Sequence, residues 1–142
     1  MPPEDLPAAH LTVEQLLADA RLGLDRLSPT MAHDALTNGA FLIDIRSEVQ
    51  RLHEGEIPGA KWFPRNALEW RLDPTSPNRD PDTARRDVLL IVFCDEGYQS
   101  SLAAATLRRF GLNATDMIGG VRAWRDAGLP IRPLDNEAEL RL

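Results

Sequence analysis

Cysteine is scarce in this chain: Cys94 is the only one among 142 residues. A single thiol cannot form an internal disulfide, and with three scattered histidines it gives no spacing typical of a zinc site. We therefore expect no disulfide, no metal and no cofactor. An unpaired thiol persists most readily in a reducing compartment, so we expect a cytoplasmic protein.

Positive charge and long apolar runs are also lacking. Sixteen Lys and Arg residues stand against 22 Asp and Glu, a net charge of -6, which gives no general attraction to nucleic acid or anionic lipid. Nowhere do about 18 apolar residues follow one another, and the acidic, Pro-rich start MPPEDLPAAH is unlike a signal peptide. We expect neither nucleic acid nor a membrane as a partner. With 43% hydrophobic residues, the composition indicates a globular protein.

Two helices are predicted before the first strand. Thr12 and Gln15 form a capping-box pattern, and apolar residues follow at helical spacing, which predicts an amphipathic helix over 12–25. This helix would be an arm lying on the rest of the protein. A Ser-Pro pair at Ser28 then indicates the start of a second helix, which ends before Gly39.

The remaining sequence alternates between strands and helices. AFLIDI at 40–45 and DVLLIVFC at 87–94 are apolar runs, and the second is apolar at nearly every position. Such a run indicates a strand buried on both faces, as in a parallel sheet with helices on each side. A helix over 100–110 and a short strand at 115–118 continue the alternation, which predicts an α/β fold with a mainly parallel sheet.

Cys94 falls at the carboxyl end of the second strand, where ligands bind in α/β sheets. The residues DEGYQ must turn the chain into the next helix, and Gly97 relieves the steric cost of that turn. A loop of this kind directs backbone N–H groups toward its centre, where a thiolate or persulfide would be held. The alternative is an inert core cysteine, the commoner role of a lone thiol. No histidine can be placed beside Cys94 from the sequence, so a Cys-His hydrolase would lack its second catalytic residue.

Three separated motifs resemble those of single-domain rhodaneses, the sulfurtransferase family. FLIDIRSEVQRLHEGEIPGAKWFP is similar to the family's Asp-x-Arg strand end followed by an Ile-Pro-Gly-Ala turn, and CDEGYQS to its Cys-x-x-Gly-x-x-Ser/Ala loop. GGVRAWRDAGLPI resembles its Gly-Gly-x-x-x-Trp ending. The resemblance implies a rhodanese-like three-layer α/β domain over 28–133, with a helical arm at 1–27 and a tail at 134–142.

The resemblance also implies a mechanism. Cys94 would be the nucleophile that takes sulfur from thiosulfate or a persulfide, carries it as a persulfide, and passes it to cyanide, a thiol or a sulfur-relay protein. The expected substrate-binding residues are those of the loop, through their backbone, and two arginines: Asp95, Glu96, Gly97, Tyr98, Gln99, Ser100, Arg46 and Arg65. We expect a monomer or a homodimer.

Asp44 and Arg46 match the family's Asp-x-Arg pair. We expect Asp44 to give structural support by pairing with Arg46, with anion contact by Arg46 as the alternative. Arg65 would bring a positive charge to the mouth of the site, and a solvated helix start is its alternative role.

The loop also departs from the family pattern. Asp95, Glu96 and Gln99 stand where family members active on thiosulfate often carry Arg, Lys, Ser or Thr, and Glu56 replaces a frequent histidine. Thiosulfate is a dianion, so these acids predict weak thiosulfate turnover and a less charged persulfide or a partner protein as the donor.

Two other classes of function stay open. A non-catalytic rhodanese module for binding or regulation is disfavoured because Cys94 is present. A phosphatase or arsenate reductase is disfavoured because five residues separate Cys94 from Ser100. Those relatives have a loop one residue longer that ends in an arginine.

Overall fold

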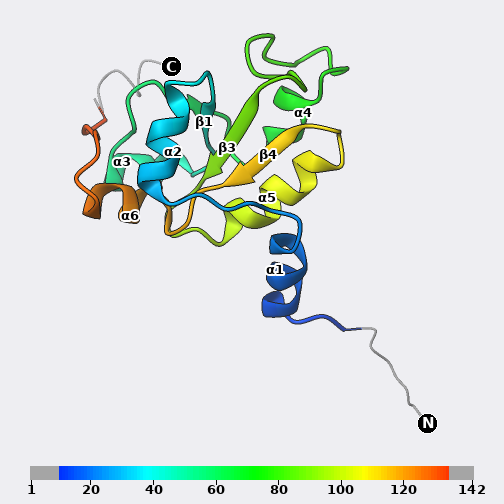
Figure 1. Ribbon diagram of the computed structural model, residues 1–142, viewed down its shortest axis with the longest axis horizontal. Coiled ribbons are helices and arrows are strands. Elements are labelled where there is room, and N and C mark those ends of the chain that lie inside the picture. Colours follow the sequence, from blue (N-terminus) through cyan, green and yellow to red (C-terminus); the bar gives the residue numbers. More distant parts are fainter. Residues whose placement is uncertain (1–9, 135–142) are drawn as a thin grey trace.

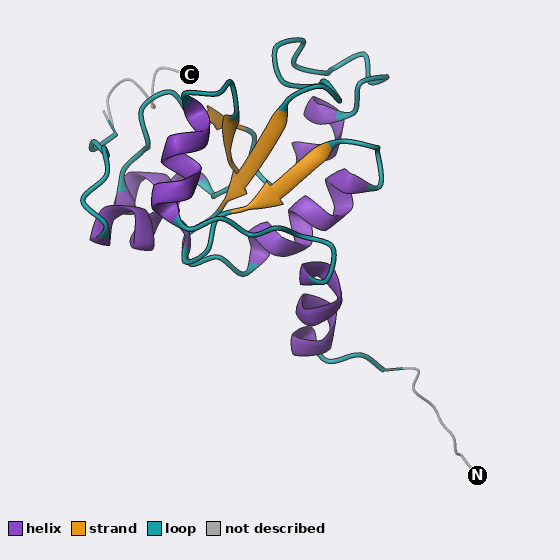
Figure 2. Cartoon of the chain, in the orientation of Figure 1, coloured by secondary structure: helices purple, strands orange, loops and turns teal. Residues whose placement is uncertain are grey.

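The computed structural model describes residues 10–134, so residues 1–9 of the predicted arm and 135–142 of the predicted tail lie outside the described part. A four-stranded sheet runs through the centre, in the order β2-β1-β3-β4, and every neighbouring pair of strands is parallel. Helices cover both faces of this sheet (Figures 1 and 2). The predicted α/β fold with a parallel central sheet is confirmed.

The elements follow one another in strict alternation after the arm. The helices are α1 Val13–Arg21, α2 Pro29–Leu36, α3 Glu48–Glu54, α4 Leu68–Leu72, α5 Gln99–Arg108 and α6 Gly120–Asp126. The strands are β1 Phe41–Asp44, β2 Lys61–Trp62, β3 Leu89–Phe93 and β4 Asn113–Asp116.

The central strand β3 is buried on both faces, as its continuous apolar sequence predicts. Leu90 and Val92 belong to the core cluster packed against α4 and α5. Ile91 and Phe93 belong to the opposite cluster, with residues of α2 and α6. Because side chains alternate along a strand, the next residue, Cys94, falls on the α5 side.

The arm helix α1 is capped as predicted, with the Thr12 hydroxyl and the Gln15 side chain in a reciprocal capping box. It ends at Arg21 rather than at residue 25, because Gly23 disfavours another turn of helix. The helix lies against α5 and buries none of its residues (Figure 1). Leu24, just after it, is buried in the core.

The last strand lies earlier than the sequence predicts. β4 spans Asn113–Asp116 rather than 115–118, because its pairing with β3 ends at Asp116 and the chain then turns at Gly119. Pairing with a central strand decides the extent of such a short, polar strand more than its own propensity does.

The longest described helix, α5, has ten residues, so no helix within residues 10–134 could cross a bilayer. In the same range, no group of three or more His, Cys, Asp or Glu side chains is placed to hold a metal ion.

Candidate functional site

Cys94 directly follows β3, and the residue is 7% exposed. The backbone N–H of Gly97 donates to Cys94 Sγ at 3.2 Å, and the N–H of Ser100 donates to it at 3.4 Å. Ser100 lies in the first turn of α5, so one donor comes from the loop and one from the helix start. Two inward N–H groups favour negative charge on the sulfur.

The loop keeps this shape because it packs on the turn before α6. Gly97 has a φ of +93°, and a Cβ there would lie 2.7 Å from the backbone nitrogen of Gly119. From the other side, the N–H of Val121 donates to the Cys94 carbonyl at 2.9 Å. The glycines of the loop and of this turn are therefore needed for close backbone contact.

Cys94 opens into a pocket of about 390 Å³. Most of the predicted site residues line it, namely Cys94, Asp95, Glu96, Tyr98, Gln99, Arg46 and Arg65. Gly97 and Ser100 do not line the pocket but supply the two N–H donors to the sulfur. Ile45, Ser47 and Gln50 complete the wall, and none of them was predicted as a site residue.

The predicted Asp44–Arg46 pair is present and buried. Arg46 Nε and Nη2 donate to the two carboxylate oxygens of Asp44 at 2.9 and 2.8 Å. Nη2 also donates to the Gly55 carbonyl at 2.8 Å, which ties the end of β1 to the end of α3. Arg46 also lines the pocket, and its Nη1 has no hydrogen-bond partner within residues 10–134. Because the Arg46 side chain is 0% exposed, the structure shows the structural role of this pair, and anion contact by Arg46 stays a prediction.

Arg65 lies at the pocket wall, as predicted, but its charge is partly offset. Its Nη1 pairs with Glu69 Oε1 at 2.8 Å, and both side chains remain about a third to a quarter exposed (32% and 25%). An exposed pair of this kind is held weakly, so Arg65 could exchange Glu69 for an incoming anion.

The two acids of the loop share a cation that sequence reasoning missed. Arg122 of α6 pairs with Asp95 at 3.0 Å and with Glu96 at 3.2 Å. The Asp95 carboxylate, followed by that of Glu96, raises the pKa of Arg122. Because Arg122 offsets both acids, the mouth of the pocket is less negative than the loop sequence alone indicates.

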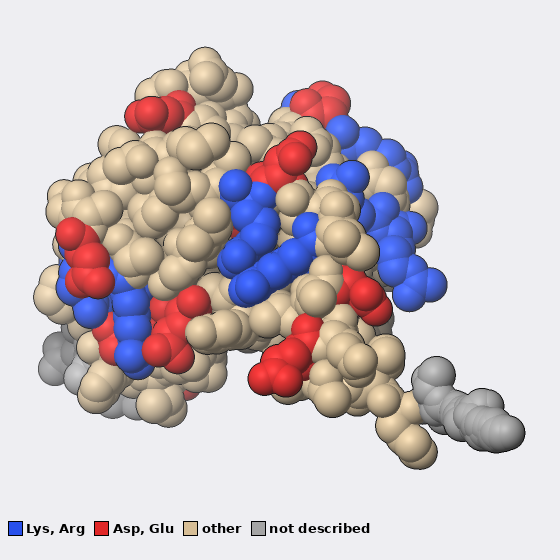
Figure 3. Space-filling model, turned by 60° about the horizontal axis from the view of Figure 1, so that its bottom comes forward, with Lys and Arg blue, Asp and Glu red and all other residues tan. Residues whose placement is uncertain are grey.

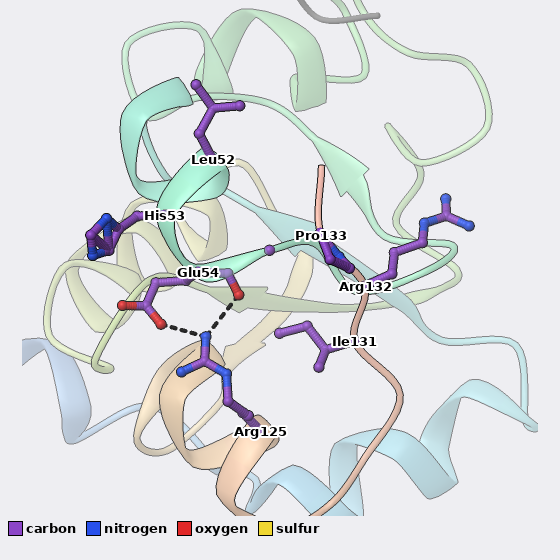
Figure 4. Close-up of a pocket in the computed structure, with 8 residues that line it drawn as sticks. Leu52, His53, Glu54, Arg125, Ile131, Arg132 and Pro133 are labelled. Carbon is purple, nitrogen blue, oxygen red and sulfur yellow. Dashed lines mark hydrogen bonds and ion pairs between the residues drawn. The ribbon is translucent and has the colours of Figure 1, made fainter. Parts of the chain in front are cut away.

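Arg122 belongs to a chain of charges that continues to α3. Its guanidinium lies 3.6 Å from Glu54, and Glu54 also pairs with Arg125, whose hydrogen bond lowers the pKa of Glu54. Arg125 donates to the Glu54 backbone carbonyl as well, at the wall of a second hollow that shares no residue with the Cys94 pocket (Figure 4). Glu54 thus contacts Arg122 from the side of α3, and neither Glu54 nor Arg125 lines the Cys94 pocket.

A family model described as the rhodanese-like domain matches residues 28–127. The match includes β1, the Cys94 loop and the Gly119–Gly120 turn, which together form the site described above. The chain belongs to the rhodanese-like family. No curated protein matches it significantly.

Solved structures share this rhodanese-like fold. A Rhodopseudomonas palustris protein of unknown function, a possible tyrosine phosphatase, is 31% identical with a TM-score of 0.79, covering 90% of this chain and 100% of that one. A rhodanese-related protein from Thermoplasma volcanium is 21% identical with a TM-score of 0.62, covering 75% of this chain and 96% of that one. Thiosulfate sulfurtransferase from Pseudomonas aeruginosa is 24% identical with a TM-score of 0.61, and the match covers 80% of this chain and 20% of that one.

The rhodanese-like match begins at residue 28, but the site has contacts from before it. Arg21 and Arg26 both donate to the carbonyl of Gly97 from the arm. In Figure 3 the base of the molecule is brought forward, and basic side chains form a band in the middle of that face, with acidic side chains beside it. No sequence signal connects these arginines with a loop more than 70 residues away.

Proposed function

We propose that the protein is a sulfurtransferase that carries sulfane sulfur as a persulfide on Cys94. The observation that carries the proposal is the pair of N–H groups, from Gly97 and Ser100, that donate to Cys94 Sγ. Preformed donors of this kind stabilise an anionic sulfur both before and after it is loaded. An inert core cysteine has no need of them, and it does not line a pocket as Cys94 does.

The reaction has two displacement steps. The Cys94 thiolate attacks the outer sulfur of thiosulfate or of a persulfide, and the donor's S–S bond breaks with its electron pair leaving on sulfite or on the donor thiolate. An acceptor thiolate or cyanide, or a thiolate of a sulfur-relay protein, then attacks the terminal sulfur of the Cys94 persulfide. The electron pair of that S–S bond returns to Sγ, which restores the thiolate.

The pocket supports an anionic donor. Arg46 and Arg65 both line it, while Arg122 offsets the charges of Asp95 and Glu96 at its mouth. Together these charges permit a monoanionic persulfide more readily than a dianion, because one Arg122 cation faces two loop carboxylates and the remaining negative charge repels a dianion more strongly. We therefore retain weak thiosulfate turnover as part of the proposal.

Intact-mass measurement tests the proposal directly. After incubation with thiosulfate, and separately with cysteine persulfide, we expect the protein to gain the mass of one sulfur, with faster loading from the persulfide. Because Cys94 is the only cysteine, every added sulfur reports on this residue, and Cys94→Ala is expected to gain none. A protein that stays unloaded with both donors would contradict sulfur transfer and favour a binding module.

The possible-phosphatase neighbour makes an aryl phosphate a necessary control substrate. We expect no hydrolysis, because residues 95–100 include no arginine to bind the phosphate oxygens. Hydrolysis that Cys94→Ala abolishes would favour the phosphatase instead.

Replacing Arg122 with glutamine is expected to reduce kcat/KM for thiosulfate about five- to tenfold, because Asp95 and Glu96 would then oppose the dianion without a counter-charge. For a monoanionic persulfide we expect a loss of about threefold or less, since the repulsion scales with the donor's charge. Steady-state rates with each donor at two salt concentrations measure this, and the difference should shrink at high salt.

Arg125→Gln is the matched control for that experiment. Arg125 lies on the same helix and pairs with Glu54, but it contacts neither loop acid and does not line the Cys94 pocket. We expect nearly unchanged selectivity between the donors. Equal losses for both donors in Arg122→Gln would show that the residue acts only by holding the structure.

A further inference from the structure

Two arginines of the arm contact the Cys94 loop on the side away from the sulfur. Arg21, the last residue of α1, donates through Nη2 to the Gly97 carbonyl at 2.8 Å, and Arg26 donates to the same oxygen at 3.0 Å. Gly97 is buried, so its carbonyl depends on protein donors rather than on solvent. Two charged donors on one backbone oxygen form a strong restraint.

The same arginines contact the start of α5 and the end of β4. Arg21 Nε donates to Ser101 Oγ at 3.0 Å, and Arg26 Nε pairs with Asp116 Oδ1 at 2.8 Å. The Asp116 side chain is 0% exposed and accepts bonds from the hydroxyls of Ser100 and Ser101, both at 2.8 Å. We call this set the arm network: Arg21, Arg26, Gly97, Ser100, Ser101 and Asp116.

The arm network holds both residues that donate to the sulfur. Gly97 gives its N–H to Cys94 Sγ while its carbonyl is bound by the two arginines. Ser100 gives its N–H to Sγ while its hydroxyl is bound to Asp116, which is itself paired with Arg26. Each donor is therefore fixed from the side away from the sulfur, by a different polar group of the same residue.

We propose that Arg21 and Arg26 are positioning residues for sulfur transfer, and that residues 10–27 of the arm form part of the functional unit with the rhodanese-like domain. This inference rests on the proposed function. A donor group lowers a barrier only when it is already in place as charge develops, and displacements of about 1 Å are costly. The arm supplies that preorganisation without lining the pocket.

The test compares sulfur loading in the full chain and in four variants. In the double variant Arg21→Gln/Arg26→Gln we expect kcat for sulfur loading to fall about ten- to 100-fold, because the N–H groups of Gly97 and Ser100 shift away from the sulfur. We expect KM for the sulfur donor to stay within about twofold, because the pocket wall does not shift. Arg21→Lys is expected to keep more of the rate than Arg21→Gln, since an ammonium can still donate to the Gly97 carbonyl. Arg109→Gln, an exposed arginine at the end of α5, should load at the wild-type rate.

The double variant also removes the cation paired with buried Asp116, so its thermal midpoint must be measured. Should it fail to fold, Arg21→Gln alone leaves the Arg26–Asp116 pair intact, and we expect it to slow loading about three- to tenfold. Loading at the wild-type rate in the folded double variant, or in Arg21→Gln where the double variant does not fold, would overturn the proposal.

A second readout separates this inference from the proposed function. The rate at which iodoacetamide alkylates Cys94 depends on the N–H donors to the sulfur but needs no sulfur donor. We expect alkylation to slow about threefold or more in Arg21→Gln at neutral pH. If the wild type loads no sulfur but alkylation slows in Arg21→Gln, the positioning role is supported and the proposed sulfur transfer is contradicted. An unchanged or faster alkylation rate would overturn the positioning role.

Discussion

Replacing Asp44 with alanine is expected to lower the free energy of unfolding by about 3–5 kcal/mol, because it leaves a buried positive charge without a counter-charge. The Arg46 side chain is 0% exposed, and both carboxylate oxygens of Asp44 accept its hydrogen bonds. Without Asp44, Arg46 would keep the Gly55 carbonyl as a partner, which cannot neutralise the charge. Urea unfolding followed by tryptophan fluorescence measures the loss.

A surface pair of the same geometry provides the control. Asp87 accepts two hydrogen bonds from Arg85, but its side chain is 71% exposed, so Asp87→Ala should have a far smaller effect. Combining Asp44→Val with Arg46→Met should recover part of the loss, because an apolar pair needs no counter-charge. Equal losses in Asp44→Ala and Asp87→Ala would contradict a special role for the buried pair.

The sheet could be predicted from the sequence because a strand that is buried on both faces is apolar at every position. β3 is apolar at every position, and Cys94 continues its alternation onto the α5 side. Hydrophobic patterns of this kind are local, so no knowledge of the tertiary fold is needed to find them. The Asp44–Arg46 pair, which the resemblance to the family's Asp-x-Arg motif implies, is also present.

The elements between β1 and β3 could not be predicted. α3 and α4 have seven and five residues, too few for a clear helical period, and β2 has two. The start of α3 is set by a local capping box between Ser47 and Gln50. Its end is held by a tertiary contact as well, because the Gly55 carbonyl accepts a hydrogen bond from the Arg46 guanidinium.

The charge balance of the site was also beyond sequence reasoning. Asp95 and Glu96 predict a negative loop, but Arg122 pairs with both from a helix 26 or more residues later. Arg21 and Arg26 are 71 and more residues from Gly97. Long side chains at such separations come into contact only because β4 and its flanking turns bring the arm, the loop and α6 together. These contacts cannot be inferred from a single sequence.

Replacing Gly120 with alanine should both destabilise the protein and impair sulfur loading. A Cβ at Gly120 would lie 2.5 Å from the Asp95 carbonyl oxygen and 2.6 Å from that of Cys94, and neither is a flexible side-chain end. Its φ of +64° adds strain for any L side chain. We expect unfolding to become easier by about 2–4 kcal/mol, from overpacking and backbone strain together.

Gly128→Ala separates these two causes. Gly128 also has a positive φ, +75°, but a Cβ there meets no atom within 4 Å, so only the backbone strain of about 1 kcal/mol applies. Urea unfolding and the rate of sulfur loading should be measured for both variants. Because the clash at Gly120 moves the backbone of Cys94 and Asp95, we expect loading to slow more than tenfold in Gly120→Ala and to stay nearly unchanged in Gly128→Ala. If both variants lose the same stability and the same loading rate, the turn at Gly120 matters only through its backbone strain. If Gly120→Ala loses much more loading rate than Gly128→Ala, the close packing of this turn determines the position of Cys94.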